Sequence, residues 1–408
     1  MINYIKRRLP SGDFQHDLRN SGSITSKELL NHSEIQSNKS KILFIIDEHY
    51  VDWKKYFKDR KLFADYDIRI EQATFNEIGL SAHSNGGISI GINTFRSGIP
   101  VIRSFHPDFV LVRQYVKDVD VNWINIILGM QYGAVPSINS MRALYNFQDR
   151  PWIYAELCQI QRRLGAEKFP LISQTYYPNH RKMFISPPYP SVIKIGHAHQ
   201  GLGKILIKNT YDYHEITGII EISQCYSTIE PYIPGRCDIY LQKIGQHYKA
   251  LRRTSLSNNW KANIGSCIIE KIPLTERYRL WLDEVSQIFG GLDLCAIELI
   301  QTNDGKEYII QINDCTMQLI GENQEEDYQM IADLIVHKME IYCRPNEQVT
   351  ILTRISSFDQ LPKFSSNDEE KPSSNGNIRQ TLDRIYTINT LNNLKQTFSN
   401  LFNQMNVK

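Results

Sequence analysis

Residues 192–204 combine the features of a buried strand with those of an anion-binding loop. The stretch begins as the β-branched run Val192-Ile-Lys-Ile195, in which Lys194 interrupts the apolar pattern. It then becomes rich in glycine and basic residues, namely Gly196, His197, Gly201, Gly203 and Lys204. Because glycine lets backbone amides approach an anion closely and lysine supplies positive charge, we predict a loop that covers phosphate groups. The spacing matches neither the P-loop nor the dinucleotide-binding fingerprint, and a hairpin tip without a ligand is the alternative.

Polar residues downstream of this loop are of the types that bind the other parts of a nucleotide. Residues 226–233 end a predicted strand at a Glu-Pro turn, where Glu230 and the backbone up to Ile233 can face an adenine edge. Asp238 suits a ribose hydroxyl. The alternative is an ordinary Glu-Pro turn. Two later segments supply cationic and amide groups that suit a triphosphate: Arg252 or Arg253, Lys261 and Asn263.

Glu298 interrupts an otherwise apolar strand, residues 295–300. A buried carboxylate is costly unless it is paired or bound to a metal ion. The next predicted strand carries Gln311 and Asn313, and oxygen ligands from two adjacent strands suit Mg²⁺ or Ca²⁺. We therefore predict these three residues as metal ligands. The alternative for Glu298 is a charge on the outer face of its strand.

Residues 41–140 read as a parallel α/β lobe, because predicted strands alternate with helices. The strands are expected at 41–47, 66–74, 101–103, 108–113 and at the end of 133–139, and the helices at 53–57 and 123–132.

Residues 141–345 read as an antiparallel α+β lobe. Its first helix is expected at 144–164, with Trp152 and Cys158 facing inward, and three more at 215–224, 276–289 and 326–342. The predicted strands are 169–177, 189–195, 203–207, 226–233, 237–244, 248–253, 264–272, 296–302 and 307–312. Two lobes joined in this way form a cleft in which a nucleotide can be held.

The two ends of the chain have the composition of tails. Residues 1–40 are rich in Ser, Asn and charge, which predicts a mostly disordered arm, and Ser11 lies three positions after Arg8 as a candidate phosphorylation site. Chance occurrence in a basic tail is the alternative. Residues 346–390 read as a flexible linker, and apolar residues at helical spacing predict an amphipathic helix over 391–408. That helix is expected to dock on a partner, on the core or on a membrane surface.

Composition narrows the class of protein. The chain has 408 residues and a net charge of +2, so its bulk charge gives no reason to expect nucleic acid as a partner. Seven scattered cysteines without a CxxC pair indicate a reducing compartment. No apolar run approaches 18 residues and no signal-peptide core is present, so we expect a cytoplasmic protein whose membrane contact is peripheral.

The order of these candidate ligands is that of the ATP-grasp fold, and the chain resembles the synapsin family. The resemblance spans about 41–343. It is carried by Ile46-Asp-Glu-His-Tyr-Val-Asp-Trp-Lys-Lys-Tyr-Phe57, Pro107-Asp-Phe-Val-Leu-Val-Arg-Gln114, Phe169-Pro-Leu-Ile-Ser-Gln-Thr-Tyr-Tyr-Pro-Asn-His180, Lys194-Ile-Gly-His-Ala-His199, Gln242-Lys-Ile-Gly-Gln246, Ile288-Phe-Gly-Gly-Leu-Asp293 and Leu319-Ile-Gly321. Residues 1–9 and 394–402 resemble the terminal segments of that family.

The resemblance implies a two-lobed ATP-grasp core, a homodimer that binds ATP with Mg²⁺ or Ca²⁺ and has no turnover. It implies a phosphoprotein on the cytoplasmic face of synaptic vesicles in the presynaptic terminal. There it tethers vesicles to actin and to one another and regulates neurotransmitter release. The family's nucleotide site corresponds to Lys194, the 196–204 loop, Glu230, Lys261, Asn263 and Glu298.

Three departures from the family pattern bear on function. Gln311 stands where the family usually has a metal-binding Glu, Asn313 or Asp314 stands in place of the strand-closing Gly of that motif, and Pro10 stands where the phosphoserine normally lies. The long proline-rich region of larger synapsins is also absent from this sequence. An active ATP-grasp ligase that joins a carboxylate to an amine is the main alternative. A structural adaptor with a pocket that binds no nucleotide is the other.

Overall fold

The computed structural model describes residues 39–345 except 97–98, 180, 182, 184–185, 198, 200, 258 and 262–264. The side chains of residues 96, 99 and 100 are likewise outside the described part. The predicted N-terminal arm with Ser11, the linker, the helix over 391–408 and Asn263 all lie outside the described residues.

The first lobe is built on a sheet of order β2-β3-β1-β7-β8. Its strands are Lys61–Leu62, Tyr66–Ala73, Ser40–Ile46, Phe109–Val112 and Ser137–Ile138. β1 pairs in parallel with β3 and β7, and the apolar ends of both β1 and β7 are buried. A central parallel strand is covered on both faces, which explains why these sequences read as continuous apolar runs.

A second, antiparallel sheet in this lobe was not predicted as a whole. Its order is β4-β5-β6, and the strands are Ile78–Ala82, Ile88–Arg96 and Ile99–Phe105. The sequence predicts only a short strand at 101–103 in this region. Ile88, Ile90 and Ile92 are the buried side chains of β5, and Ser89 and Gly91 occupy the positions between them. A period-2 signal was therefore present, although glycine has a low strand propensity.

Two helices, α3 and α4, replace the single helix predicted over 144–164. They are Met141–Asn146 and Arg150–Leu164, and Pro151 lies in the first turn of α4, where its missing N–H costs nothing. The inward orientation predicted for Trp152 is wrong. Its side chain is 57% exposed, and its indole N–H donates to Asn146 Oδ1 at 2.9 Å, because the new helix start rotates it outward.

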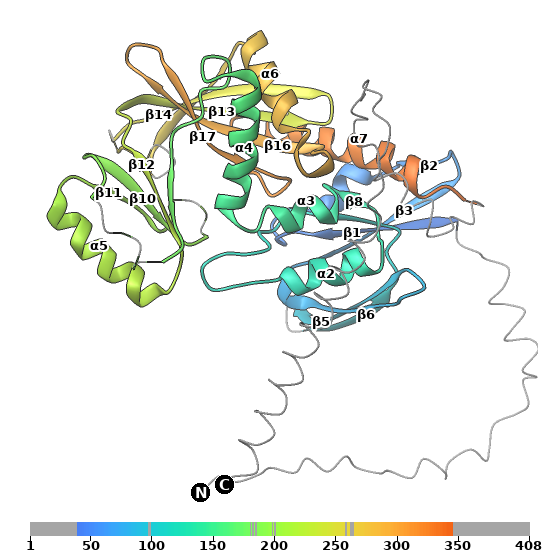
Figure 1. Ribbon diagram of the computed structural model, residues 1–408. Helices are drawn as coiled ribbons and strands as arrows, with labels where there is room; N and C mark the ends of the chain where they lie inside the picture. Colours follow the sequence, from blue (N-terminus) through green and yellow to red (C-terminus); the bar gives the residue numbers. More distant parts are fainter. Residues whose placement is uncertain are drawn as a thin grey trace, which may run out of the picture. The chain divides into compact units, whose positions relative to one another are not determined.

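The second lobe contains two antiparallel sheets (Figure 1). The smaller has the order β11-β10-β12-β9, with strands Lys204–Ile207, Ser191–Ile195, Ser227–Pro231 and Thr175–Tyr177, and α5 (Thr210–Ser223) lies against it. The larger has the order β15-β14-β13-β16-β17, with strands Cys267–Ile272, His247–Ser255, Gly235–Ile244, Leu294–Thr302 and Glu307–Asn313. The strand predicted at 169–177 is shorter, because its first part pairs with β17 of the other sheet: Ile309 N donates to Pro170 O at 2.8 Å, and Ile172 N donates to Ile309 O at 3.0 Å.

The remaining helices cover the sheets and complete the core. They are α2 (Ile124–Tyr132), α6 (Glu276–Val285), α7 (Gln324–Tyr342) and the short 3₁₀ turns Trp53–Phe57, Phe75–Glu77 and Ile288–Gly290. Ile331, Ile335 and Met339 of α7 are fully buried in the core that also contains β1 and β7. α7 therefore joins the second lobe to the first through shared apolar packing.

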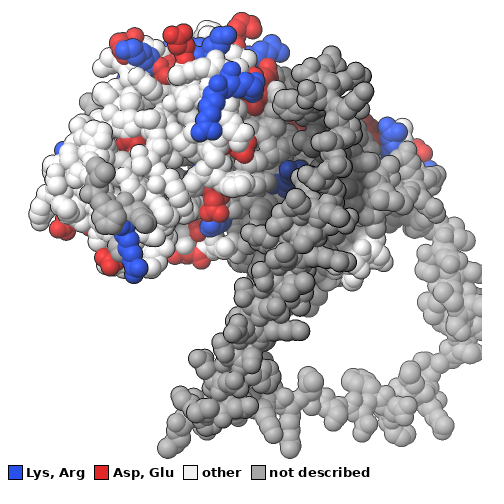
Figure 2. Space-filling view, viewed as in Figure 1, with Lys and Arg blue, Asp and Glu red and all other residues white. Residues whose placement is uncertain are grey.

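Charged side chains are mixed on the face shown in Figure 2, where basic and acidic groups occur side by side. Within the described residues, no helix has the length and apolar character needed to cross a membrane.

Asn139 makes two buried hydrogen bonds that join the first lobe to β16. Its side chain donates to Leu294 O at 2.8 Å and accepts from Leu294 N at 2.9 Å, and the residue is fully buried. We expect Asn139→Ala to lower the free energy of unfolding by roughly 2–4 kcal/mol, because two backbone groups lose their partners. Denaturant unfolding measures this loss. Asn93→Ala, at an exposed position on β5, is the control, and equal losses in both variants would contradict the prediction.

Candidate functional site

A cavity lies between the two antiparallel sheets of the second lobe. Most of the predicted site residues line it: Lys194, Gly196, Gly201, Lys204, Glu230, Ile233, Asp238, Arg253, Lys261, Glu298, Gln311 and Asn313. These residues are spread over more than a hundred positions of sequence, so the fold brings them together.

Strand register explains why the polar residues of the larger sheet share one face. Alternate residues of a strand point to the same side, which puts Asp238 and Tyr240 of β13 on the cavity side. Arg253 of β14 pairs with Asp238, and Glu298 of β16 pairs with Tyr240. Gln311 of β17 then pairs with Glu298. The register therefore lines up acidic, basic and amide groups across four neighbouring strands.

Basic groups and one buried carboxylate dominate the smaller sheet. Lys194 lies opposite both Lys204 and Thr228, and its Nζ is 2.7 Å from Glu230 Oε2. The Glu230 side chain is only 4% exposed, and Gln174 Nε2 also donates to it at 3.4 Å. A carboxylate this buried needs such partners. Burial, and then the nearby Lys194 charge, lowers the pKa of Lys204.

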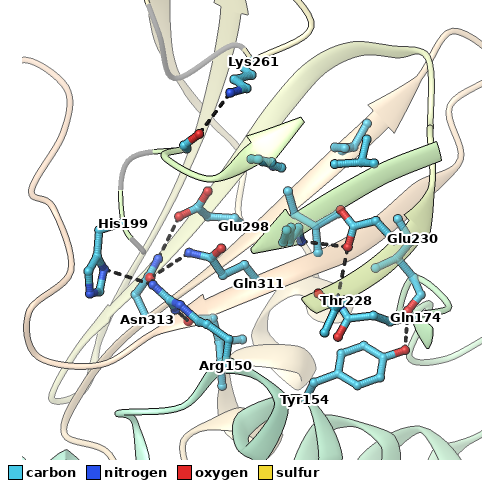
Figure 3. A pocket seen from close by; sticks show the side chains of 18 of the residues that line it. Arg150, Tyr154, Gln174, His199, Thr228, Glu230, Lys261, Glu298, Gln311 and Asn313 are labelled. Carbon is cyan, nitrogen blue, oxygen red and sulfur yellow. Dashed lines mark hydrogen bonds and ion pairs between the residues drawn. The ribbon is translucent and has the colours of Figure 1, made fainter. Parts of the chain in front are cut away.

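Glu298, Gln311 and Asn313 converge at the other wall of the cavity, as Figure 3 shows. Asn313 Nδ2 donates to Glu298 Oε1 at 2.8 Å, and Gln311 Nε2 donates to Asn313 Oδ1 at 3.1 Å. Arg253 Nη2 lies 3.9 Å from Glu298 Oε2 and 3.2 Å from Asp238 Oδ2. Burial raises the pKa of Asp238, and the Arg253 charge opposes that rise.

The oxygen atoms of this group are of the type that Mg²⁺ and Ca²⁺ prefer. One carboxylate and two amides fit a divalent cation, but Gln311 adds no negative charge, so the set has less charge than two carboxylates would give. Among the residues that the structure describes, no group of three His, Cys, Asp or Glu side chains forms a metal cluster.

The glycine-rich hairpin between β10 and β11 is attached to the segment after β14. Lys261 Nζ donates to Gly201 O at 3.0 Å, and Lys204 and Lys261 both lie near the ring of Trp260. Gly203 has φ +63°, and a Cβ there would come within 2.9 Å of Ile195 O. Only glycine fits that position. Gly203 was predicted to contact the nucleotide, but it is not among the residues that line the cavity. Its backbone conformation shapes the hairpin.

Family comparisons match almost the whole described region. The synapsin pre-ATP-grasp domain matches residues 36–137, and the synapsin ATP binding domain matches residues 139–341. A Drosophila melanogaster protein named synapsin is 43% identical over 338 residues, which cover 82% of this chain.

The chain belongs to the synapsin family. It spans about a third (33%) of the length of the Drosophila synapsin that it matches.

Solved structures show the same fold at low identity. The ATP-grasp ligase PsnB, complexed with a precursor variant, Mg and ADP, is 14% identical with a TM-score of 0.50 and covers 74% of this chain and 99% of that chain. The VanG D-Ala:D-Ser ligase from Enterococcus faecalis is 9% identical with a TM-score of 0.50 and covers 73% of this chain and 98% of that chain. The predicted two-lobed ATP-grasp fold is thereby confirmed.

Several residues that line the cavity of this synapsin-family chain were not predicted from the sequence. They include Tyr115, Arg150, Tyr154, Gln174, His199, Tyr226 and Thr228. Arg150 and Gln174 lie far from the glycine-rich stretch in sequence and have no local signal. His199 lies inside that stretch, but the sequence gives no reason to prefer it over His197.

His197 was predicted to contact the nucleotide, but it is not among the residues that line the cavity. Its Nε2 faces His199 Nε2 at 3.2 Å. His199 lines the cavity, stacks on Tyr115 with ring centroids 3.7 Å apart and receives a hydrogen bond from Arg150 Nη2 at 3.0 Å. His197 therefore contacts the ring of His199 and does not itself line this cavity.

Hydrogen bonding fixes the charge state of His199. Arg150 can only donate, so His199 Nδ1 accepts, and His199 Nε2–H donates to Lys117 O at 3.0 Å. A second proton on the ring would point at the Arg150 guanidinium. Burial first, and then Arg150, lowers the pKa of His199 to about 4. Burial and Arg150 likewise lower the pKa of His197 to about 2.

Stability is expected to fall on acidification because of His199. Below pH ~6.5 the unfolded chain binds a proton on this ring that the folded chain excludes until the folded pKa is reached. The free energy of unfolding should therefore drop by roughly 2–3 kcal/mol more in the natural chain than in His199→Gln between pH 6.5 and 4. Denaturant unfolding at several pH values measures the difference. Parallel pH profiles for the two proteins would contradict the assignment of a neutral, buried His199.

Proposed function

We propose that the cavity binds ATP together with a divalent cation. The observation that carries this proposal is the arrangement of charge: Lys194, Lys204, Lys261 and Arg253 line the cavity together with Glu298. A triphosphate needs cationic partners, and a cation bridging it to the protein needs an oxygen ligand. The synapsin family assignment and the ATP-grasp fold support the same conclusion.

Each part of the nucleotide has a candidate partner on this chain. The segment from Glu230 to Ile233 would hold the adenine, and Asp238 the ribose. Lys194, Lys204 and Lys261 would meet the phosphates. Glu298, Gln311 and Asn313 would hold Mg²⁺ or Ca²⁺, and the cation would neutralise phosphate charge. The ADP and Mg complex of PsnB supports the pairing of nucleotide with cation in this fold.

The protein acts, in our proposal, on the cytoplasmic face of synaptic vesicles. It tethers vesicles to actin and to one another as a homo-oligomer, regulates neurotransmitter release and is itself regulated by phosphorylation at Ser11. Family membership supports this, and the terminal segments that carry Ser11 and the helix over 391–408 are part of the proposal. Co-sedimentation with purified synaptic vesicles tests it, and recovery of all the protein in the vesicle-free fraction would argue against it.

We propose that ATP is bound without turnover. Gln311 removes a charge from the metal-binding group, which weakens the hold on a cation across the phosphates during chemistry. The structural neighbours PsnB and VanG are ligases, which keeps an active carboxylate–amine ligase as the second candidate function.

Turnover distinguishes the two candidate functions. With Mg²⁺ or Ca²⁺ and a panel of carboxylic acids and amines, the purified protein should release no ADP above the buffer rate. Sustained ADP release at roughly 1 s⁻¹ or faster would establish the ligase reading instead. A pocket that binds no nucleotide would show no ATP-dependent rise in melting temperature.

Lys194→Ala is expected to weaken ATP binding by about 10- to 150-fold, the scale of a lost charge-assisted hydrogen bond of roughly 1.5–3 kcal/mol. The change also exposes the phosphates to Glu230, whose carboxylate loses its partner at 2.7 Å. Calorimetric titration measures the affinity.

Two further variants make this test specific. The double variant Lys194→Ala with Glu230→Gln removes both charges and leaves no unpaired buried carboxylate, so its melting temperature shows how much of the effect of Lys194→Ala comes from lost stability. Lys208→Ala, at an exposed position just after β11, is the matched control and should bind ATP normally. A loss smaller than about twofold in Lys194→Ala would place this lysine away from the phosphates.

A further inference from the structure

The hairpin between β10 and β11 is attached to two sides of the nucleotide cavity. On one side, the His199 ring accepts a hydrogen bond from Arg150 Nη2 at 3.0 Å and donates one to Lys117 O at 3.0 Å. Figure 3 shows the His199 and Arg150 side chains pointing toward one another. On the other side, Gly201 O accepts a hydrogen bond from Lys261 Nζ at 3.0 Å. The hairpin is therefore held both to the first lobe and to the segment after β14.

The two hairpin acceptors occupy cationic groups of the cavity. Arg150 and Lys261 both line the cavity, and Lys261 is one of the proposed phosphate partners. His199 Nδ1 and Gly201 O are neutral acceptors. A phosphate oxygen is charged, and its hydrogen bond with a cation is stronger. The hairpin acceptors and the phosphate oxygens of a nucleotide therefore compete for the same donors.

The cavity under the hairpin is small for a nucleotide. Its volume is about 140 Å³, whereas pockets for drug-sized ligands measure roughly 300–1,000 Å³. A nucleoside triphosphate is a ligand of that size, so the hairpin has to move outward to admit one. Leu202 N donates to His199 O at 3.0 Å, and Ile195 N donates to Gly203 O at 2.9 Å, which keeps the hairpin together as one unit. When it moves, the contacts at His199 and Gly201 have to break.

We propose that the hairpin is an autoinhibitory element, which holds the cavity closed through His199 and Gly201 and so competes with ATP. This rests on the proposed function, because ATP is taken as the ligand. The chain then has a closed conformation with the hairpin attached and an open conformation that admits ATP. The apparent affinity for ATP is the affinity of the open conformation reduced by the fraction of molecules that are open. Contacts made only in the closed conformation therefore weaken ATP binding.

His199→Leu tests the proposal in the full-length chain. Leucine can neither accept from Arg150 nor donate to Lys117 O. The variant should bind ATP with Mg²⁺ about tenfold more tightly, the scale of two hydrogen bonds lost from the closed conformation. The gain should lie in the association rate, with the release rate changed less than about threefold, because the broken contacts are absent from the bound state. Calorimetry measures the affinity, and stopped-flow tryptophan fluorescence measures the rates, since Trp260 lines the cavity.

Two control variants make the effect specific to the contact. His199→Gln supplies an amide that can accept from Arg150 and donate to Lys117 O, so it should bind ATP like the natural chain. His214→Leu makes the same change of residue type at an exposed position on α5, away from the cavity, and should also bind normally.

Tyr115→Leu weakens the same contact from the first lobe. It removes the ring on which His199 stacks, with centroids 3.7 Å apart, and should tighten ATP binding about threefold. Added to His199→Leu, it should give no further gain, because both changes act on one contact. If His199→Leu does not fold, Tyr115→Leu decides the question alone.

The outcomes separate this proposal from the proposed function. Tighter binding in His199→Leu with normal binding in both controls supports it, and so does ATP binding by the variants when the natural chain binds none. If the natural chain binds ATP and His199→Leu binds it equally or more weakly, the proposal is overturned and the proposed function stands. The same holds if His214→Leu tightens binding as much as His199→Leu does. No ATP binding by the natural chain, His199→Leu or Tyr115→Leu overturns both.

Discussion

The pairing of buried charges across the larger sheet is the constraint on which the site depends. Four neighbouring strands place Asp238, Arg253, Glu298 and Gln311 on one face, and the antiparallel register fixes which of them meet. Charges removed from water are stable only with partners at close range. The Arg253 side chain is only 8% exposed and lies close to two carboxylates, those of Asp238 and Glu298. These ion pairs stabilise the charges on this face, and Glu298 still lines the cavity.

The same rule governs the smaller sheet, with the signs exchanged. Glu230 is the buried charge there, and Lys194 and Gln174 are its partners. The lysines near it exceed the carboxylates, so the two walls of the cavity differ in charge and a triphosphate with a cation complements both.

The first lobe holds the larger sheet in place at two points. Asn139 bonds to the backbone at the start of β16, and Arg113 donates to Cys315 O just after β17. Both strands that carry the proposed metal ligands are thus anchored outside their own sheet.

Residues with a local sequence signal are those that the structure brings to the cavity as predicted. The lysine in the β-branched run 192–195, the glycines before Lys204 and the single carboxylate in the apolar run 295–300 are each recognisable within a few residues of sequence. Residues that reach the cavity only through the tertiary fold were not predicted from the sequence. Arg150 begins a helix and Tyr115 follows a strand, and neither neighbourhood distinguishes them from ordinary surface residues. The β4–β6 sheet was missed although β4 and β5 alternate regularly, because the glycines in both strands lower their strand propensity. Trp152 was misplaced because Pro151 lies in the first turn of a new helix. The resemblance to synapsins was carried by motifs over three quarters of the chain, and the family matches confirm it.

The most direct test of the central claim is a calorimetric titration of ATP into the natural chain and into Glu298→Gln, each with Mg²⁺, with Ca²⁺ and with a chelator. Because one wall of the cavity carries lysines and the other carries Glu298, we predict that a cation strengthens ATP binding to the natural chain. We also predict that this gain largely disappears in Glu298→Gln, while the weaker cation-free binding remains. Equal ATP affinity with cation and with chelator in the natural chain, or no binding under any of these conditions, would contradict the account.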